Sequence, residues 1–211
     1  MKYGYSYRKA IGELICAMVI CRPDISFALI KLSQYSAAPA AEHFTAVHNI
    51  YKYLKKTPTN GVYFWRADPR KDREEKPNPI YSHTNNHKEE TREQTDLKRM
   101  RAIVDSDFAN DTNYRRSITG ICIKLADGCI YYKIHFQPTV SLSSIEEEFI
   151  AAYEAAKAIL YVRSILDDIG KPQDSATTLY EDNQGAPIMA NSGKPTKRTR
   201  HMDTKYFAIQ Y

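Results

Sequence analysis

The sequence predicts a mixed α/β layer fold for its second half, preceded by a small helical unit. Residues 5–56 space their apolar side chains as helices do, whereas residues 98–211 read as β-β-β-α-β-α-loop-α. Residues 66–97, between these two parts, are almost devoid of apolar groups. The chain has 211 residues, 43% of them hydrophobic and 26% charged, which is typical of a globular protein that buries a core.

Three helices are predicted within residues 5–56. Apolar residues of the first two recur at helical spacing, and they are Ile11, Leu14, Ile15, Met18, Ile25, Ala28, Leu29 and Leu32. Pro23 lies between the two stripes and suits a first helical turn. The third helix is expected at residues 40–56, where two final lysines suit the negative end of the helix dipole. A short strand is expected at residues 61–65.

Residues 66–97 are predicted to form a charged, solvated linker. They mix prolines with interleaved acids and bases, so they cannot bury enough apolar surface to offset the entropy lost on ordering. His83 and His87 have the i, i+4 spacing of some metal sites, but nothing around them predicts a helix. The linker interpretation is therefore preferred.

Residues 98–211 begin with three strands that are expected to form an antiparallel meander, at 102–108, 117–125 and 129–135. A long amphipathic helix is expected at 143–169, ending at Gly170.

A fourth strand is expected at 177–181, followed by a short helix at 184–190, a basic loop at 191–201 and a last helix from about Asp203. A strand reached through a helical crossover pairs in parallel with an earlier strand. The fourth strand is therefore expected beside the first.

The net charge of +5 permits a nucleic-acid partner without requiring one. The four cysteines form no CxxC pair and no secretion signal is recognised, so reduced thiols in the cytoplasm or nucleus are expected rather than secretion. Residues 10–21 are interrupted by Glu13 and are shorter than the roughly 20 residues that a membrane span needs. No membrane partner is expected.

Three consecutive glutamates, Glu146, Glu147 and Glu148, open the long predicted helix. Ser143 with Glu146, or Ser144 with Glu147, fits a capping box, and the positive end of a helix stabilises acids. Taken alone, the three acids are best explained as helix-start residues.

Two further acids occupy unusual positions. Asp105 lies within an apolar strand, where aspartate is disfavoured, and Asp182 ends the fourth predicted strand. If those strands are neighbours, the two acids converge, and the long helix brings a glutamate beside them. Converging carboxylates repel one another unless cations hold them, and hard oxygen ligands select Mg²⁺ or Mn²⁺. Two such ions about 4 Å apart catalyse phosphodiester hydrolysis. Each acid alone is better explained as a cap or a solvated residue; their joint placement favours a metal site.

Five motifs follow one another in this half: Val-Asp-Ser-Asp-Phe-Ala (104–109), Arg-Arg-Ser-Ile-Thr-Gly (115–120), Gln-Pro-Thr-Val-Ser-Leu-Ser-Ser-Ile-Glu-Glu-Glu-Phe-Ile-Ala-Ala (137–152), Tyr-Glu-Asp-Asn (180–183) and Arg-Thr-Arg-His-Met-Asp (198–203). Together they resemble the ribonuclease H domain of copia-type retrotransposon Pol polyproteins. Upstream, Tyr-Arg-Lys-Ala-Ile-Gly-Glu-Leu (7–14), Arg-Pro-Asp-Ile (22–25) and Glu-His-Phe-Thr-Ala-Val (42–47) resemble the thumb and connection that end the same polyprotein's reverse transcriptase. Nearly the whole chain outside residues 66–97 is covered.

The resemblance implies a ribonuclease H-like mixed sheet and a catalytic site of four acids that bind two Mg²⁺ or Mn²⁺ ions. The matching positions, in chain order, are Asp105, Glu146, Asp182 and Asp203. Glu148 matches a second family acid whose role is unclear. Glu147 stands where the family often has alanine, and it is expected to be an ordinary helix-start acid.

An RNA/DNA hybrid is the implied substrate, and basic residues are expected to contact it. They are Arg115, Arg116, Lys194, Lys197, Arg198, Arg200 and His201. A solvated charge run explains the loop residues equally well, and His201 could assist proton transfer or serve only a structural role.

The predicted function is hydrolysis of the RNA strand of RNA/DNA hybrids during reverse transcription, with the rest of the Pol polyprotein as a candidate partner. No polymerase activity is expected, since the reverse transcriptase palm is absent. Two alternatives stay open: a non-catalytic module that grips the hybrid, and a decayed retroelement fragment without activity. In an active element, the protein is expected in a cytoplasmic or nuclear virus-like particle.

Overall fold

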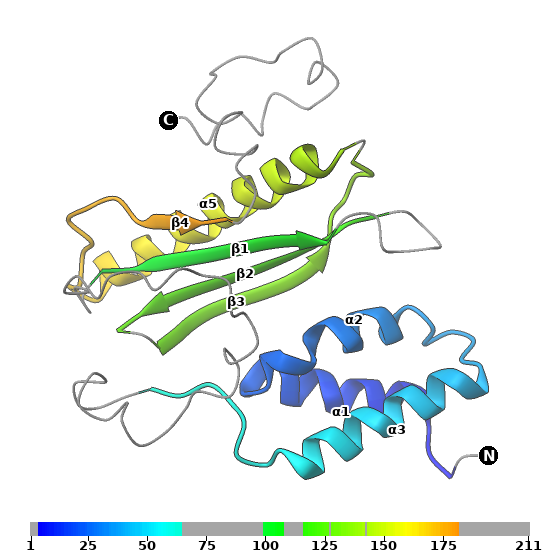
Figure 1. Ribbon diagram of the computed structural model, residues 1–211. Helices are drawn as coiled ribbons and strands as arrows, with labels where there is room; N and C mark the ends of the chain where they lie inside the picture. Colours follow the sequence, from blue (N-terminus) through cyan, green and yellow to red (C-terminus); the bar gives the residue numbers. More distant parts are fainter. Residues whose placement is uncertain (1–3, 65–98, 108–115, 127, 142, 182–211) are drawn as a thin grey trace. The chain divides into compact units, whose positions relative to one another are not determined.

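The computed structural model describes residues 4–64, 99–107, 116–126, 128–141 and 143–181. The chain divides into two compact units, Met1–Glu93 and Gln94–Tyr211. The first is helical, and the second is built on a sheet (Figure 1). The predicted linker, the helix at 184–190, the basic loop and the last helix lie outside the described residues and stay predictions.

The helical unit consists of α1 (Tyr7–Ile20), the short 3-10 helix η1 (Pro23–Ile25), α2 (Ser26–Ser33) and α3 (Ala41–Lys56). This confirms the three predicted helices. Their apolar stripes meet in one core, in which Leu14, Leu29 and Val47 are at most 1% exposed. Pro23 begins η1, where its fixed φ and its missing N–H are tolerated.

Arg22 connects the turn after α1 to the end of α3 through hydrogen bonds. It is 5% exposed, and its guanidinium donates to the Asp24 carboxylate at 2.7 Å and to the Thr57 carbonyl at 2.9 Å. The Tyr53 hydroxyl also donates to Asp24, at 2.9 Å. Burial acts to raise the pKa of Asp24, but the hydrogen bonds from Arg22 and Tyr53 outweigh it and hold that pKa below its ordinary value.

The predicted strand at residues 61–65 is wrong for its described part, residues 61–64, which form no strand. Val62 donates one backbone hydrogen bond, to the Cys21 carbonyl at 3.2 Å. A strand needs a neighbouring strand to satisfy its backbone groups, and the described part of this unit is helical. Gly61 permits the close approach, because a Cβ there would lie 3.3 Å from the same carbonyl oxygen.

The described part of the second unit contains a four-stranded mixed sheet of order β3-β2-β1-β4. Strands β1 (Arg101–Asp107), β2 (Ile118–Leu125) and β3 (Gly128–Phe136) form the predicted antiparallel meander. Strand β4 (Thr178–Tyr180) pairs in parallel with β1, as the crossover rule predicts. The predicted mixed α/β fold class is therefore confirmed.

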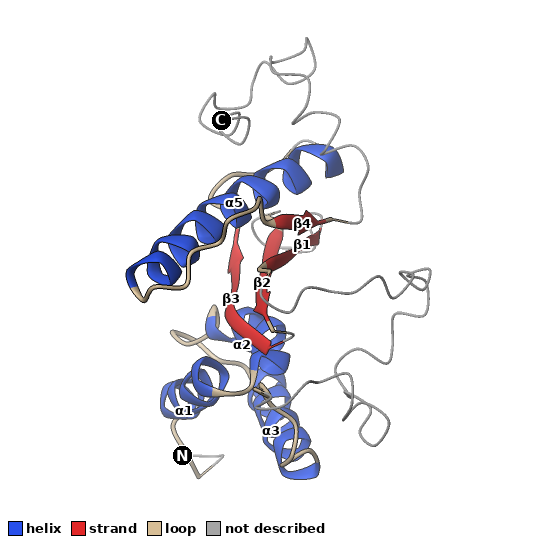
Figure 2. Ribbon diagram, turned by 90° about the vertical axis from the view of Figure 1, so that its left-hand side faces the viewer, coloured by secondary structure: helices blue, strands red, loops and turns tan. Residues whose placement is uncertain are grey.

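One long helix, α5 (Ser144–Asp168), lies along one face of this sheet (Figure 2). Its Ala151 and Ala155 are fully buried, and their small side chains let the helix approach sheet residues such as Ile123. Ser143 is the N-cap, and Gly170 follows the helix with φ of +71°, a conformation that favours glycine. Both predicted ends are confirmed within one residue.

Two expectations drawn from composition can also be compared with the structure. The four cysteines are free thiols in the structure. No helix in the described ranges has both the length and the apolar character needed to cross a membrane.

Candidate active site

The predicted acids of the described residues lie at the carboxyl end of β1 and at the start of α5. Asp105 and Asp107 are among the last three residues of β1. Strand β4 runs parallel to β1, with Tyr180 paired to Ile103. Because the two strands are parallel, the chain leaves β4 on the same side of the sheet as it leaves β1. Asp182 itself lies outside the described residues.

Gln137, directly after β3, anchors the first turns of α5. It is fully buried, and its Nε2 donates to the Thr119 hydroxyl at 3.0 Å and to the Glu147 carbonyl at 2.9 Å. The Ser141 hydroxyl donates to Gln137 Oε1 at 3.2 Å. These bonds join β2, the connection before α5 and α5 itself, so the acids of the helix are held in place beside the sheet.

Glu147 is the most buried of the three glutamates, with 1% of its surface exposed. Burial raises the pKa of Glu147 to about 7, a hydrogen bond with Ser117 opposes the rise, and the charges of Glu148, Asp107 and Asp105 add to it. Among the described residues, Oε2 of Glu147 has no hydrogen-bond partner. An ionised carboxylate that is buried without a partner raises the free energy of the folded state. A bound cation would offset that increase.

Glu146 lies in the first turn of α5, three residues after the N-cap Ser143. Its backbone N–H donates to the Ser143 hydroxyl at 3.2 Å, which confirms that half of the predicted capping box. The charges of Asp105 and Asp107 on β1 act on the pKa of Glu147. The resemblance, by contrast, assigned the role of metal ligand to Glu146. The assignment of Glu146 stays a prediction. Glu147 lies in the first turn of α5, as predicted, but it is also buried and electrostatically coupled to β1, which was not predicted.

The sequence does not show that the three glutamates are buried. Three consecutive helical residues cover about 200° of the helix circumference, and a helix that packs an apolar stripe against one sheet can leave that much of its circumference to polar residues. No local pattern marks Gln137 either, because its role depends on partners far away in the sequence.

Most of the predicted nucleic-acid contacts cannot be placed, because they lie outside the described residues. These are Arg115, Lys194, Lys197, Arg198, Arg200 and His201, and the predicted ligands Asp182 and Asp203 lie outside as well. Arg116 is described and exposed, and it directly precedes Ser117, the buried hydrogen-bond partner of Glu147.

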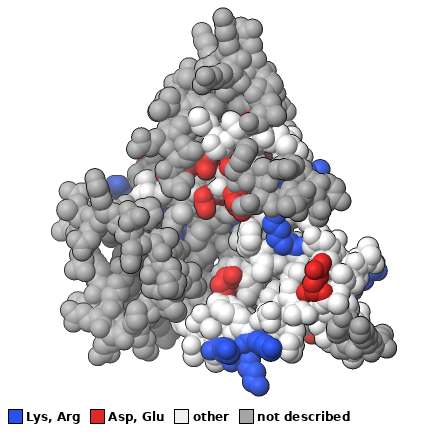
Figure 3. Space-filling model, turned by 45° about the vertical axis from the view of Figure 1, so that its right-hand side comes forward, with Lys and Arg blue, Asp and Glu red and all other residues white. Residues whose placement is uncertain are grey.

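Within the described ranges, no group of three or more His, Cys, Asp or Glu side chains could by itself hold a metal ion. The chemistry of the acids nevertheless suits one: Asp105, Asp107, Glu147 and Glu148 offer carboxylate oxygens, the donors that Mg²⁺ and Mn²⁺ prefer. The unsatisfied buried oxygen of Glu147 fits the same group. In Figure 3, several acidic side chains lie close together in the upper middle of the view, and other acidic side chains stand apart from them.

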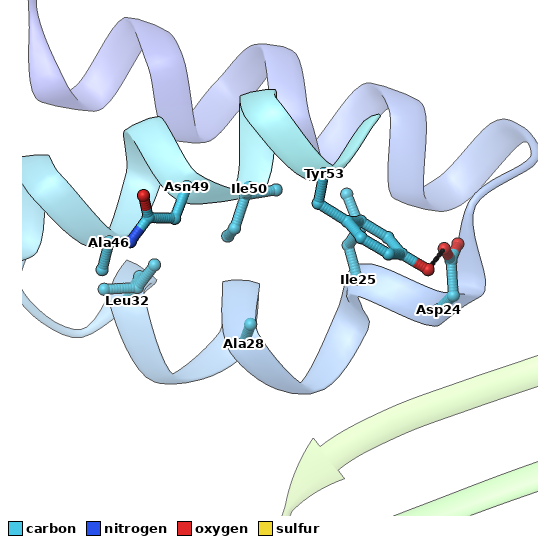
Figure 4. Close-up of a pocket in the computed structure, with 8 residues that line it drawn as sticks. All are labelled: Asp24, Ile25, Ala28, Leu32, Ala46, Asn49, Ile50 and Tyr53. Atoms are coloured by element: carbon cyan, nitrogen blue, oxygen red, sulfur yellow. Dashed lines mark hydrogen bonds between the residues drawn. The ribbon is translucent and has the colours of Figure 1, made fainter. Parts of the chain in front are cut away.

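The helical unit has a shallow hollow of about 460 Å³ between α2 and α3 (Figure 4). Apolar side chains such as Leu32 and Ile50 line it. Asp24 and Tyr53 stand at one end, hydrogen-bonded to each other. The hollow therefore offers apolar surface rather than a catalytic group.

Comparison with known proteins relates the chain to transposon polyproteins. It is 29% identical over 204 residues to the retrovirus-related Pol polyprotein from transposon TNT 1-94 of Nicotiana tabacum. It is also 30% identical over 156 residues to the secreted RxLR effector protein 161 of Plasmopara viticola, a match that covers 74% of this chain and 90% of that protein. The chain belongs to the same family as this second relative. A third relative, the Pol polyprotein from transposon RE2 of Arabidopsis thaliana, is 26% identical over 204 residues.

The two Pol polyprotein matches relate the chain to retroelement proteins, and they differ greatly in how much of each protein they cover. Both Pol matches cover 97% of this chain, but only 13% and 12% of the tobacco and Arabidopsis polyproteins. The chain therefore spans a small part of those relatives. No protein-family model and no solved structure matches it.

Proposed function

We propose that residues 98–211 are the ribonuclease H of a copia-type retrotransposon, which hydrolyses the RNA strand of RNA/DNA hybrids. The observation that carries the proposal is the buried carboxyl of Glu147, coupled to Asp105 and Asp107 at the end of β1. The relation to transposon Pol polyproteins supports it. In the same proposal, residues 1–65 are the end of the reverse transcriptase.

The acids would hold two Mg²⁺ or Mn²⁺ ions. Asp105 and Glu147 are the described candidates, joined by the predicted ligands Asp182 and Asp203, with Glu146 as the alternative on α5. Such ions, when bound, supply activation of a water molecule and stabilisation of the leaving 3′ oxygen. The protein's own part is to hold the carboxylates in place: Ser117 bonds to the Glu147 side chain, and the Gln137 amide bonds to the helix backbone.

The proposed substrate, an RNA/DNA hybrid, determines which groups the protein must contact. A nuclease specific for RNA in a hybrid must contact 2′-hydroxyls on one strand and phosphates on the other. The exposed Arg116 lies next to Ser117 in sequence, so its guanidinium is a candidate for a phosphate contact near the acids.

The test is cleavage of a labelled RNA/DNA hybrid by the purified chain with Mg²⁺ or Mn²⁺. Asp105→Asn and Glu147→Gln should each lower the rate by at least about 100-fold while the fold is kept, since each removes a carboxylate that would bind metal. The cleavage rate of Glu146→Gln tests the alternative that Glu146, rather than Glu147, is the metal ligand on α5. Asp168→Asn is the matched control, because it changes an exposed acid at the far end of α5.

A DNA duplex should not be cut in the same assay. If the folded wild-type chain cuts no hybrid but binds it with unchanged affinity in all variants, the chain is a non-catalytic binding module. If it neither cuts nor binds the hybrid, the decayed-fragment alternative is correct.

A further inference from the structure

Two thiols face each other across neighbouring strands in the second unit. Cys122 lies in β2 and Cys129 in β3, and their Sγ atoms are 3.4 Å apart. Cys129 pairs with Lys124, two residues along β2 from Cys122, so the thiols are diagonal neighbours on one face of the sheet. The register is irregular between Ile123 and Lys124, beside this pair.

We propose that Cys122 and Cys129 form a dithiol site that a low-molecular-weight disulfide, such as oxidised glutathione, converts reversibly to a cross-strand disulfide. One protein thiolate attacks a sulfur of the reagent and releases one glutathione thiolate, which leaves a mixed disulfide on the protein. The second protein thiol then loses its proton and attacks the protein sulfur of that mixed disulfide, releasing the second glutathione. Two protein thiols become one disulfide, and one oxidised glutathione becomes two reduced molecules.

The geometry suits this exchange. A disulfide bond is about 2.0 Å long, so the sulfurs must approach by only about 1.4 Å, a movement within the reach of side-chain rotation. Both cysteines are partly exposed, so a small reagent has access to them. A hydrogen bond with Cys122 and burial raise the pKa of the Cys129 thiol, while the charge of Lys124 acts to lower it. Either thiol can attack the reagent first, because the exchange is completed from either mixed disulfide.

The bond would join β2 and β3 near the turn that connects them. The opposite end of the same strand pair is already linked, by the hydrogen bond between Gln137 and Thr119. The bond would close a short loop containing the β2–β3 turn, which restricts the unfolded chain. The oxidised protein should therefore melt about 5–10 °C higher than the reduced protein.

The test uses the full native chain and oxidised glutathione, followed by alkylation of free thiols and tryptic digestion. Cleavage after Lys124 places Cys122 in peptide 117–124 and Cys129 in peptide 125–133. The expected product is these two peptides joined, lighter by two hydrogen atoms than their sum, and separated again by dithiothreitol. Cys16 and Cys21 are the internal control, because both are exposed thiols of the helical unit.

Two variants sharpen the result. Replacing both Cys16 and Cys21 by serine should leave the linked peptide unchanged. Cys122→Ser should abolish it and leave Cys129 reduced or bound to glutathione. The proposal is overturned if native wild-type protein yields both peptides alkylated or separately glutathionylated, or if the link forms only after denaturation.

Discussion

Glu147→Gln should stabilise the protein at alkaline pH while removing a proposed metal ligand. The pKa of Glu147 rises from 4.5 to about 7 on folding, so the folded state binds this proton more tightly than the unfolded state. The free energy of unfolding must then decrease as pH rises from about 4.5 to about 7. The full shift corresponds to about 3 kcal/mol, and burial is its largest cause. We expect about 2 kcal/mol, because water screens the charges of Glu148, Asp107 and Asp105 that contribute to the shift.

Glutamine has no charge to bury and can still accept a hydrogen bond from Ser117. The variant should therefore exceed wild type by about 2 kcal/mol at pH 8, and the difference should shrink to about 0.5 kcal/mol near pH 5. Urea unfolding followed by circular dichroism at both pH values measures this directly. Asp168→Asn, in the exposed last residue of α5, should stay within about 0.5 kcal/mol of wild type at both values.

A Glu147→Gln protein less stable than wild type at pH 8, or a difference that is the same at both pH values, would refute this account of the site. Added Mg²⁺ gives a second comparison. It should stabilise wild type more than the variant, since only wild type keeps all the carboxylates that would bind the ion.

Three further changes test the framework around the sites by urea unfolding. Arg22→Ala should cost about 3 kcal/mol, because it leaves the partly buried Asp24 carboxylate without its strongest partner. Gln137→Ala should cost about 2 kcal/mol, because the buried Thr119 hydroxyl and the Glu147 carbonyl each lose a donor. Gly170→Ala should cost about 1 kcal/mol for its positive φ alone, since nothing lies within 4 Å of the added Cβ. Each expectation fails if the variant unfolds within about 0.5 kcal/mol of wild type.

Much of the described fold was predictable because its signals are local. The helices follow from apolar residues at helical spacing, and the start of α5 follows from Ser143 three residues before Glu146. The parallel pairing of β4 with β1 follows from a general rule about crossovers. The failed strand at residues 61–64 shows the limit of such signals, because its sequence suits a strand but its unit offers no strand to pair with.

The proximity of acids on β1 to a glutamate at the start of α5 was predictable from the sequence, but which glutamate is involved was not. Asp105 within an apolar strand and acids at a helix start both indicated it. Which glutamate turns toward β1 depends on the rotation of α5 about its axis. Packing of Ala151 and Ala155 on the sheet and the Gln137 bond to the helix backbone set that rotation. Such contacts join residues far apart in the sequence, so no local pattern reveals them.

The parallel ladder between β1 and β4 is short, with only three residue pairs in the described chain, from Arg101 with Thr178 to Ile103 with Tyr180. By contrast, β1 pairs with β2 along its whole length. Amide hydrogens of β4 should therefore exchange with solvent long before those of β2, through local opening that leaves the meander intact. Strand β4 is thus expected to detach and return without global unfolding, so the population of the proposed site that includes Asp182 should vary independently of the stability of the fold.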